Sequence, residues 1–163
     1  QRGMVRAIIT NLFKIQRGGL MGAIKRTPAD KAFSDCVRSA AEWTCERCHT
    51  YYEEGRRMGL HCSHYHGRGK WGVRFNVDNA EALCYGCHQY LGANPILHSE
   101  HKLELMGEGC IDILREKAND TSLGRSAKRE VKDIAKHYRQ EFKRIYDLRN
   151  EGVTGKITIE SWS

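Results

Sequence analysis

The chain has 163 residues, and its 40% hydrophobic content is enough for one compact domain with appended segments. Its 27 Lys and Arg residues against 20 Asp and Glu residues give a formal net charge of +7, which favours an anionic partner, nucleic acid being the commonest. No stretch approaches the ~20 apolar residues that a membrane-spanning helix needs, so we expect no membrane partner.

The first twenty residues contain four basic residues and no acidic one. Their apolar run, AIITNLF, is too short and too polar for a signal-peptide core. We interpret residues 1–26 as an N-terminal extension that is either disordered or not native to the protein, with Met21 as one natural start. Without an evident secretion signal, the expected location is the cytoplasm.

A helix is predicted to begin at Pro28. Thr27 can cap this helix, Pro28 suits its first position, and Asp30 lies in its first turn. Apolar residues then recur at helical spacing. The helix would open the main folded domain, which we place at residues 27–97.

Two C-x-x-C pairs follow in a segment rich in Cys, His and Gly. Paired thiols at this spacing are typical of structural zinc sites, and the odd total of seven cysteines argues against a secreted disulfide framework. A large insert must loop out between the pairs. The predicted zinc ligands are Cys45, Cys48, Cys84 and Cys87.

Both pairs also fit the C-x-x-C-H pattern of c-type haem attachment, with His49 and His88 as the residues that follow. A two-haem electron carrier would need export and a sixth ligand for each iron. The sequence shows no evident export signal, so we expect no haem.

The insert between the pairs predicts two strands followed by a helix. MGLHCSHY is expected to be a strand, HGRGKWG a glycine-rich loop, NVDN a turn, AEAL a return strand, and CYGCHQYL the start of a helix. In this order His64 leaves the first strand, Asn79 precedes the second, and His88 lies on the helix.

From residue 99 the sequence is helical again. Residues 99–120 predict two short helices broken near Gly107 and Gly109, and residues 125–150 predict one long amphipathic helix. The Lys- and Arg-rich face of the long helix is either a solvated surface or a contact for a phosphate backbone. Residues 98–150 thus form a helical C-terminal region, and residues 151–163 form a tail, either a short strand or disordered.

The order of these motifs resembles the HNH (ββα-metal, or His-Me finger) nuclease superfamily in its zinc-stapled form, with His64, Asn79 and His88 at the H, N and H positions. A closer likeness runs from C-x-x-C through HYHGR, RFNVDN and the second C-x-x-C to a basic helix ending near DLRN. It resembles the lambdoid phage NinG (Rap) recombination nuclease family over roughly residues 30–149. The implied fold class is α+β, a small zinc-stapled ββα-metal core flanked by N- and C-terminal helices.

The resemblance implies a catalytic site in which His64 takes a proton from the attacking water. Asn79 would hold the loop and orient the His64 ring, and His88 would bind a catalytic divalent cation, Mg²⁺ or Mn²⁺. Many members of the superfamily have an acid or a second histidine directly before the base, whereas this chain has Ser63. Strand alternation puts His61 on the same face as Ser63, so His61 is the predicted substitute ligand.

The expected activity is that of a metal-dependent DNA endonuclease, an endodeoxyribonuclease that hydrolyses phosphodiester bonds and leaves a 5′-phosphate. The likeness to NinG implies branched recombination intermediates (Holliday junctions or D-loops) as substrate. A phage protein of this kind would act in the cytoplasm of the bacterial host. A homodimer would suit the cleavage of two strands. The alternative is a non-catalytic zinc-containing DNA-binding module. The residues expected to contact DNA are His66, Arg68, Lys70 and Arg74.

Overall fold

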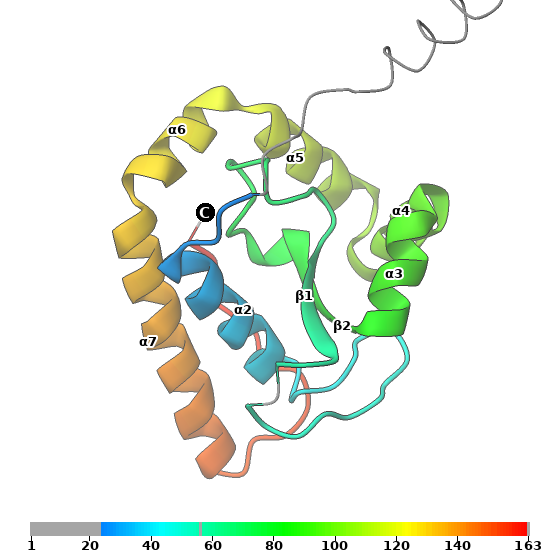
Figure 1. Cartoon of the computed structure of the whole chain (residues 1–163), viewed down its shortest axis with the longest axis vertical. Coiled ribbons are helices and arrows are strands. Elements are labelled where there is room, and N and C mark those ends of the chain that lie inside the picture. Colours follow the sequence, from blue (N-terminus) through cyan, green and yellow to red (C-terminus); the bar gives the residue numbers. More distant parts are fainter. Residues whose placement is uncertain (1–23, 56, 163) are drawn as a thin grey trace, which may run out of the picture.

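The computed structural model describes residues 24–55 and 57–162, which form an α+β protein with six α-helices and a two-stranded antiparallel sheet (Figure 1). The predicted N-terminal extension lies almost entirely outside the described residues. Within the described ranges, no helix combines the length and the apolar character needed to cross a membrane. The elements are α2 (Pro28–Ala40), β1 (Leu60–His64), the 3₁₀ turn η1 (Val77–Asn79), β2 (Ala80–Cys84), α3 (Tyr85–Ala93), α4 (Pro95–Met106), α5 (Glu108–Asn119), α6 (Thr121–Arg129) and α7 (Val131–Asn150).

Helix α2 begins where the sequence predicts and forms the centre of the core. Thr27 and Asp30 make a capping box, because the Thr27 hydroxyl accepts from the Asp30 N–H while the Asp30 carboxylate accepts from the Thr27 N–H. On the buried side of the helix, Phe33 meets Tyr138 edge to face, with 4.8 Å between ring centroids. Helix α2 therefore lies along α7, as Figure 1 shows.

The hairpin of β1 and β2 lies between α2 and the α3–α4 pair (Figure 1). Its antiparallel register pairs Leu60 with Cys84. Strand β2 passes directly into α3, since Cys84 is the N-cap and its sulfur accepts from the Cys87 N–H. The predicted order of strand, strand and helix is confirmed, and the predicted turn before β2 forms η1.

The break between α4 and α5 also lies where the sequence predicts it. Gly107 separates the two helices with a φ of +77°, a left-handed conformation that glycine adopts without steric cost. Helix α4 starts earlier than predicted, at Pro95, because proline suits the first turn of a helix.

The prediction of one continuous helix over residues 125–150 is wrong. Helix α6 starts earlier, with the Asp120 side chain as its cap, and Glu130 separates it from α7. The two helices follow different surfaces: α6 lies against the loop between the strands, with Gly124 next to Trp71, whereas α7 lies along α2. Apolar periodicity does not reveal this change of direction, because the residues around the break are all compatible with a helix.

The tail beyond α7 forms no strand within its described part and is held against α2 and α7 by hydrogen bonds. The Ile157 N–H donates to the Ala40 carbonyl at 2.9 Å, and the Ile157 side chain is buried. Arg149 also donates to the Ala40 carbonyl, and the Trp162 N–H donates to the Tyr138 hydroxyl at 3.1 Å. The tail therefore completes the core rather than extending from it.

The loop between the strands lies so close to the α5–α6 junction that Gly72 has no room for a side chain. A Cβ atom at Gly72 would lie 2.3 Å from the carbonyl oxygen of Lys117. Gly72→Ala is expected to destabilise the protein by about 1–3 kcal/mol, because backbone must move to admit the methyl group. Thermal denaturation measures this loss. Gly67→Ala, in the same loop but with nothing within 4 Å of its Cβ, is the matched control, and equal melting temperatures for the two variants would contradict the close contact.

Candidate functional site

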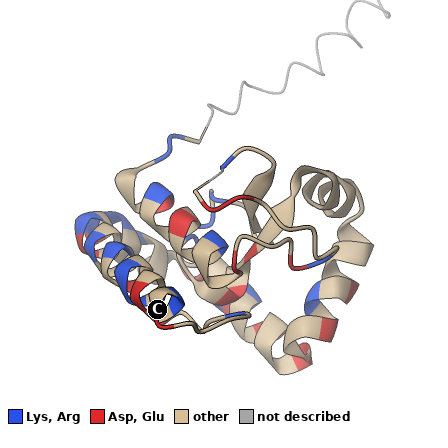
Figure 2. Cartoon of the chain, turned by 90° about the horizontal axis from the view of Figure 1, so that it is seen from below, with Lys and Arg blue, Asp and Glu red and all other residues tan. Residues whose placement is uncertain are grey.

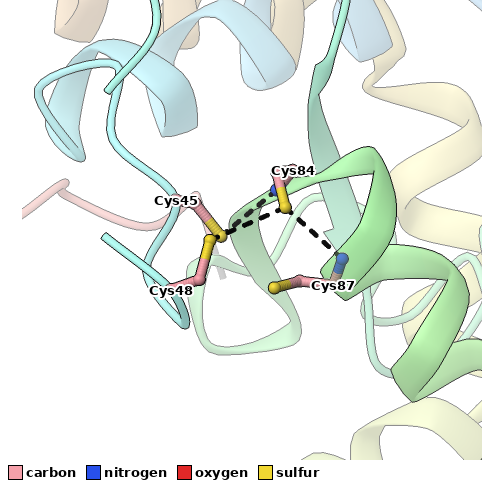
Figure 3. Close-up of side chains that lie close together, drawn as sticks. All are labelled: Cys45, Cys48, Cys84 and Cys87. Atoms are coloured by element: carbon pink, nitrogen blue, oxygen red, sulfur yellow. Dashed lines mark hydrogen bonds between the residues drawn. The ribbon is translucent and has the colours of Figure 1, made fainter. Parts of the chain in front are cut away.

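Four cysteines converge beside the hairpin, as Figure 3 shows. The first pair lies in the loop before β1, and the second pair lies at the end of β2 and in the first turn of α3. All four sulfur atoms lie within 4.8 Å of one another. The Sγ atoms of Cys48 and Cys84 are 3.7 Å apart, close to the ~3.8 Å that two Zn–S bonds of ~2.3 Å produce in a tetrahedron. A metal ion such as zinc can therefore be held by Cys45, Cys48, Cys84 and Cys87.

Hydrogen-bond donors surround these sulfurs, as anionic thiolate ligands require. The Cys84 N–H donates to the Cys45 sulfur at 3.2 Å, and the Cys87 N–H donates to the Cys84 sulfur at 3.4 Å. The Arg47 guanidinium donates to the Cys87 sulfur at 3.6 Å. These donors stabilise deprotonated sulfur, so the cluster fits the predicted structural zinc.

Convergence of both C-x-x-C pairs on one point favours a shared metal over two separate haem attachments. The histidines that follow the two pairs also have different surroundings. His49 is exposed and has a left-handed backbone with φ of +59°. His88 is half-buried on α3 and contacts a second histidine. The repeated sequence pattern thus produces two unlike environments.

The second histidine is His61, on β1. The Nδ1 atoms of His61 and His88 are 3.2 Å apart, and the ring centroids are 5.3 Å apart. This is the distance of a hydrogen bond between the two rings. It also falls in the range of roughly 3.0–3.4 Å that separates two nitrogens bound to one ion at ~2.1 Å. Burial, followed by nearby positive charge, lowers the pKa of both rings. Both imidazoles are therefore neutral near pH 7, the form that binds metal.

A carboxylate lies close to this pair in the strand register but is held elsewhere. Glu81 is opposite Ser63 across the hairpin, on the same face as His61. Its carboxylate pairs with Lys102 and with His101 of α4, the latter at 2.8 Å. Although burial alone would raise the pKa of Glu81, these cations lower it. Glu81 therefore anchors α4 to the hairpin. The side chain that contacts His88 of α3 is His61, and not Glu81.

His64 lies on the opposite face of β1 from His61. Its Nε2 atom is 3.0 Å from the carbonyl oxygen of Arg74, so the neutral ring donates from Nε2 and keeps Nδ1 as an acceptor. The Nδ1 atom is buried and has no hydrogen-bond partner among the described residues. Burial, with the charge of Arg68, lowers the pKa of His64 to about 4, so the ring is neutral near pH 7.

Asn79 is fully buried and holds the loop between the strands. Its Oδ1 accepts from the His66 N–H at 2.7 Å, and its Nδ2 donates to the carbonyls of His66 and Val73 at 2.9 and 3.0 Å. The predicted contact to the His64 ring is not present, because the Asn79 amide is used in these three bonds. The carbonyl of Arg74, in the loop that Asn79 fixes, binds the ring instead.

A cleft of about 350 Å³ opens beside His61 and His88, between α2, β1 and the loop that follows β1. Among the described residues that line it, Asp30 is the only acidic one, and its carboxylate is already paired with Arg74 at 2.7 Å. The cleft is therefore positively charged and suits an anion. The cations that line it are Arg26, Lys31, Arg38, Arg57 and Arg68.

The four loop residues predicted to contact DNA have different surroundings. Arg68 lines the cleft. Lys70 is exposed and its ammonium donates to the end of α5 at 3.0 Å, while His66 is half-buried. Arg74 is only 1% exposed and is ion-paired with Asp30, so in this structure it has no surface to offer to DNA.

The cations contributed by α2 and by the segment before β1 were not predicted from the sequence. Lys31, Ser34 and Arg38 line the cleft together. They are three and four residues apart in α2, a spacing that places polar side chains on one face of a helix and that the sequence itself contains. Arg57 comes from an irregular segment and has no comparable local signal. Its place in the cleft follows only from the fold.

Positive charge continues from the cleft onto α7, along which Figure 2 shows a series of Lys and Arg residues. Arg139 of α7 lines a second hollow together with Lys31 and Arg57. The basic surface therefore extends across α2, and its position is compatible with both predicted roles of the long helix, solvated face or phosphate contact. The exposed cations of α7 are Lys132, Lys136, Arg139 and Lys143.

The site thus has three parts: the cysteine cluster, the His61–His88 pair at the cleft, and His64 behind the strand. Comparison of the chain with models of protein families, with curated proteins and with solved structures finds no match in any of the three.

Proposed function

We propose that the protein is a metal-dependent DNA endonuclease of the HNH type, which hydrolyses phosphodiester bonds and leaves a 5′-phosphate. The observation that carries the proposal is the pair of His61 and His88, with Nδ1 atoms 3.2 Å apart, at the edge of a cation-lined cleft. Two neutral imidazoles suit a divalent metal ion, and a positive cleft suits a polyanion. The formal charge of +7 supports the same class of partner.

The cysteine cluster would act as scaffold. Four thiolates close the coordination shell of zinc and leave no open position for a substrate. Cys87 of the cluster directly precedes His88, so a zinc ion there would fix the first turn of α3 and with it the histidine. The reaction would then take place at the histidines.

His61 and His88 would hold the catalytic cation. Bound there, the cation would offset charge on the phosphate and stabilise the departing 3′-oxygen. Two imidazole nitrogens favour Mn²⁺ over Mg²⁺, because Mg²⁺ prefers oxygen ligands and an octahedral shell.

His64 would act as the general base. The Arg74 carbonyl fixes the tautomer with hydrogen on Nε2, which leaves the Nδ1 lone pair to take a proton from water. In this structure Nδ1 is buried and His64 does not line the cleft, so the role requires the ring or the loop after β1 to move when DNA is bound, which would open Nδ1 to the attacking water. Asn79 is a positioning residue in this scheme, because it fixes the loop that carries the Arg74 carbonyl.

Branched recombination intermediates, Holliday junctions or D-loops, are the proposed substrate. This part rests on the likeness of residues 45–88 to the NinG family. The basic surface that extends from the cleft across α2 to α7 would accommodate more duplex than a single linear contact needs. A homodimer would supply one site for each of two cut strands.

The direct test is incubation of the zinc-loaded protein with linear duplex, single-stranded and four-way-junction DNA, each with and without Mg²⁺ or Mn²⁺. We expect metal-dependent cleavage, faster with Mn²⁺ and strongest on the junction. Failure to cut any substrate would contradict the enzyme and favour a non-catalytic zinc-containing DNA-binding module. Equal rates of cutting for linear and branched DNA would contradict only the proposal that branched recombination intermediates are the substrate.

A further inference from the structure

We propose that Arg38 and Arg68 form the binding site for a backbone phosphate of the nucleic acid, in the cleft that the His61–His88 pair also lines. This inference rests on the proposed function and names the residues that hold the substrate. Arg38 comes from α2, and Arg68 comes from the loop after β1. A phosphate in the cleft would thus be held by side chains from two separate segments.

Arg38 is a buried cation whose hydrogen-bonding capacity is only partly used. Its side chain is 8% exposed, and one end of the guanidinium donates to Asp35 at 2.7 Å. The Nε atom has no hydrogen-bond partner among the described residues, although it is fully buried. An N–H buried without an acceptor costs about 1–3 kcal/mol. Because the side chain lines the cleft, a small turn of the guanidinium would present Nε to an anion there, which would supply the acceptor.

Arg68, which lines the same cleft, has a similar environment. Its Nη2 donates to the Cys62 carbonyl at 3.2 Å, which fixes the side chain along β1. Its Nε atom is also buried without a hydrogen-bond partner in the described part of the chain, and it lies 3.9 Å from the Asp30 carboxylate. Asp30 makes its short contacts with Arg74 instead. Two guanidinium groups with unused Nε donors therefore line the same cleft.

The surrounding charges leave this site with an excess of positive charge. Asp35 is shared among three cations: Lys31 at 3.0 Å, Arg38 at 2.7 Å and Arg57 at 2.8 Å. A single carboxylate cannot neutralise three cations, and a partly buried cluster of like charge attracts an anion more strongly than an exposed one. A phosphodiester offers two non-bridging oxygens that can accept the two parallel N–H bonds of a guanidinium fork.

The two arginines line the same cleft as the two histidines. Arg38, Arg68, His61 and His88 are all among the residues that form its walls. A phosphate held by these arginines would therefore lie beside the proposed metal ligands. The two arginines would therefore bind the phosphate at the reacting centre, and not phosphates farther along the duplex.

The test compares four variants with the zinc-loaded wild type: Arg38→Gln, Arg38→Lys, Arg68→Gln and Arg68→Lys. Affinity for fluorescently labelled four-way-junction DNA is measured by anisotropy over a range of salt concentrations, without added Mg²⁺ or Mn²⁺. Chelators are omitted because they would remove the structural zinc. Arg115→Gln is the matched control, since Arg115 lies on α5 outside the cleft and pairs with its neighbour Asp112 in an exposed contact.

Each Gln variant is expected to bind DNA roughly 10-fold or more weakly, with the dependence of log affinity on log salt reduced by about one phosphate contact. Each Lys variant keeps the charge but not the fork, so it should keep the salt dependence and lose part of the affinity. Arg115→Gln should bind within about twofold of wild type. Zinc content and melting temperature check that every variant is folded, and the Lys variants decide the question if a Gln variant does not fold.

Wild-type affinity and salt dependence in the folded Arg38 and Arg68 variants would overturn the phosphate site. If wild type cuts DNA while these variants bind and cut as it does, the nuclease stands and only this inference fails. If wild type cuts nothing but the variants still lose binding, the phosphate site stands and the nuclease fails.

Discussion

Cys87→Ser is expected to cost the protein its stable fold. The cysteine cluster joins the loop before β1 to the end of β2 and the start of α3, and next to it Glu46 of the loop and Ala82 of β2 exchange hydrogen bonds at 2.8 and 2.6 Å. A two-stranded sheet with five residues per strand is at best marginal without further support. Structural zinc contributes about 10–16 kcal/mol to folding in small zinc domains, which equals or exceeds the 5–15 kcal/mol that typically separates folded from unfolded protein.

Zinc content measured by mass spectrometry and melting followed by circular dichroism check this prediction. The variant should lose bound zinc and its cooperative melting transition, and stripping zinc from the wild type with a strong chelator should have the same effect. Cys110→Ser is the matched control, because Cys110 is exposed on α5 and lies outside the cluster. A Cys87→Ser protein that melts like wild type and retains its zinc would show that the cluster is not a structural metal site.

His64→Ala should lower the rate of DNA cleavage by about 10²–10⁴-fold, the usual contribution of a positioned general base. Binding of DNA should change little, because His64 lies behind β1 and does not line the cleft. The effect should therefore appear in kcat more than in KM. His49→Asn is the control: His49 follows the other cysteine pair, is exposed, and has a left-handed backbone that asparagine tolerates.

The pH profile offers a second measurement of the same role. Burial and the charge of Arg68 lower the pKa of His64 to about 4, and the ring must be neutral to accept a proton. A base with this pKa is lost only as the pH falls through about 4, so cleavage attributed to His64 should not decline near pH 6.5, where an exposed histidine titrates. A His64→Ala protein that cuts as fast as wild type would remove His64 from the mechanism.

The parts of the fold that the sequence predicts well depend on residues near one another in the chain. The capping box of Thr27 and Asp30 is complete within four residues, and each C-x-x-C pair also spans four residues. The strand, strand and helix order also follows from local patterns, since Gly-rich and Asn-rich turns bound short apolar runs. These signals act before any tertiary contact forms.

The parts that the sequence does not predict depend on tertiary packing. The break at Glu130 exists because α6 follows the loop between the strands while α7 follows α2. The burial of Arg74 depends on Asp30, which is far from it in sequence, so a basic residue in a glycine-rich loop was expected at the surface. The place of Arg38 in the cleft is not predicted for a related reason, because apolar periodicity identifies only the buried side of its helix.

The position of the tail and α7 against α2 has a consequence for the order in which the chain folds. Arg149 and Ser39, joined by a hydrogen bond, are 110 residues apart in sequence. Bringing such distant segments together has a large entropic cost, and contacts of this separation form slowly. Cys48 and Cys84, only 36 residues apart, would be joined first by a metal ion and would shorten the loop that remains to be closed. We therefore expect zinc uptake to precede the pairing of α2 with α7, so that refolding is faster when zinc is present from the start than when it is added late.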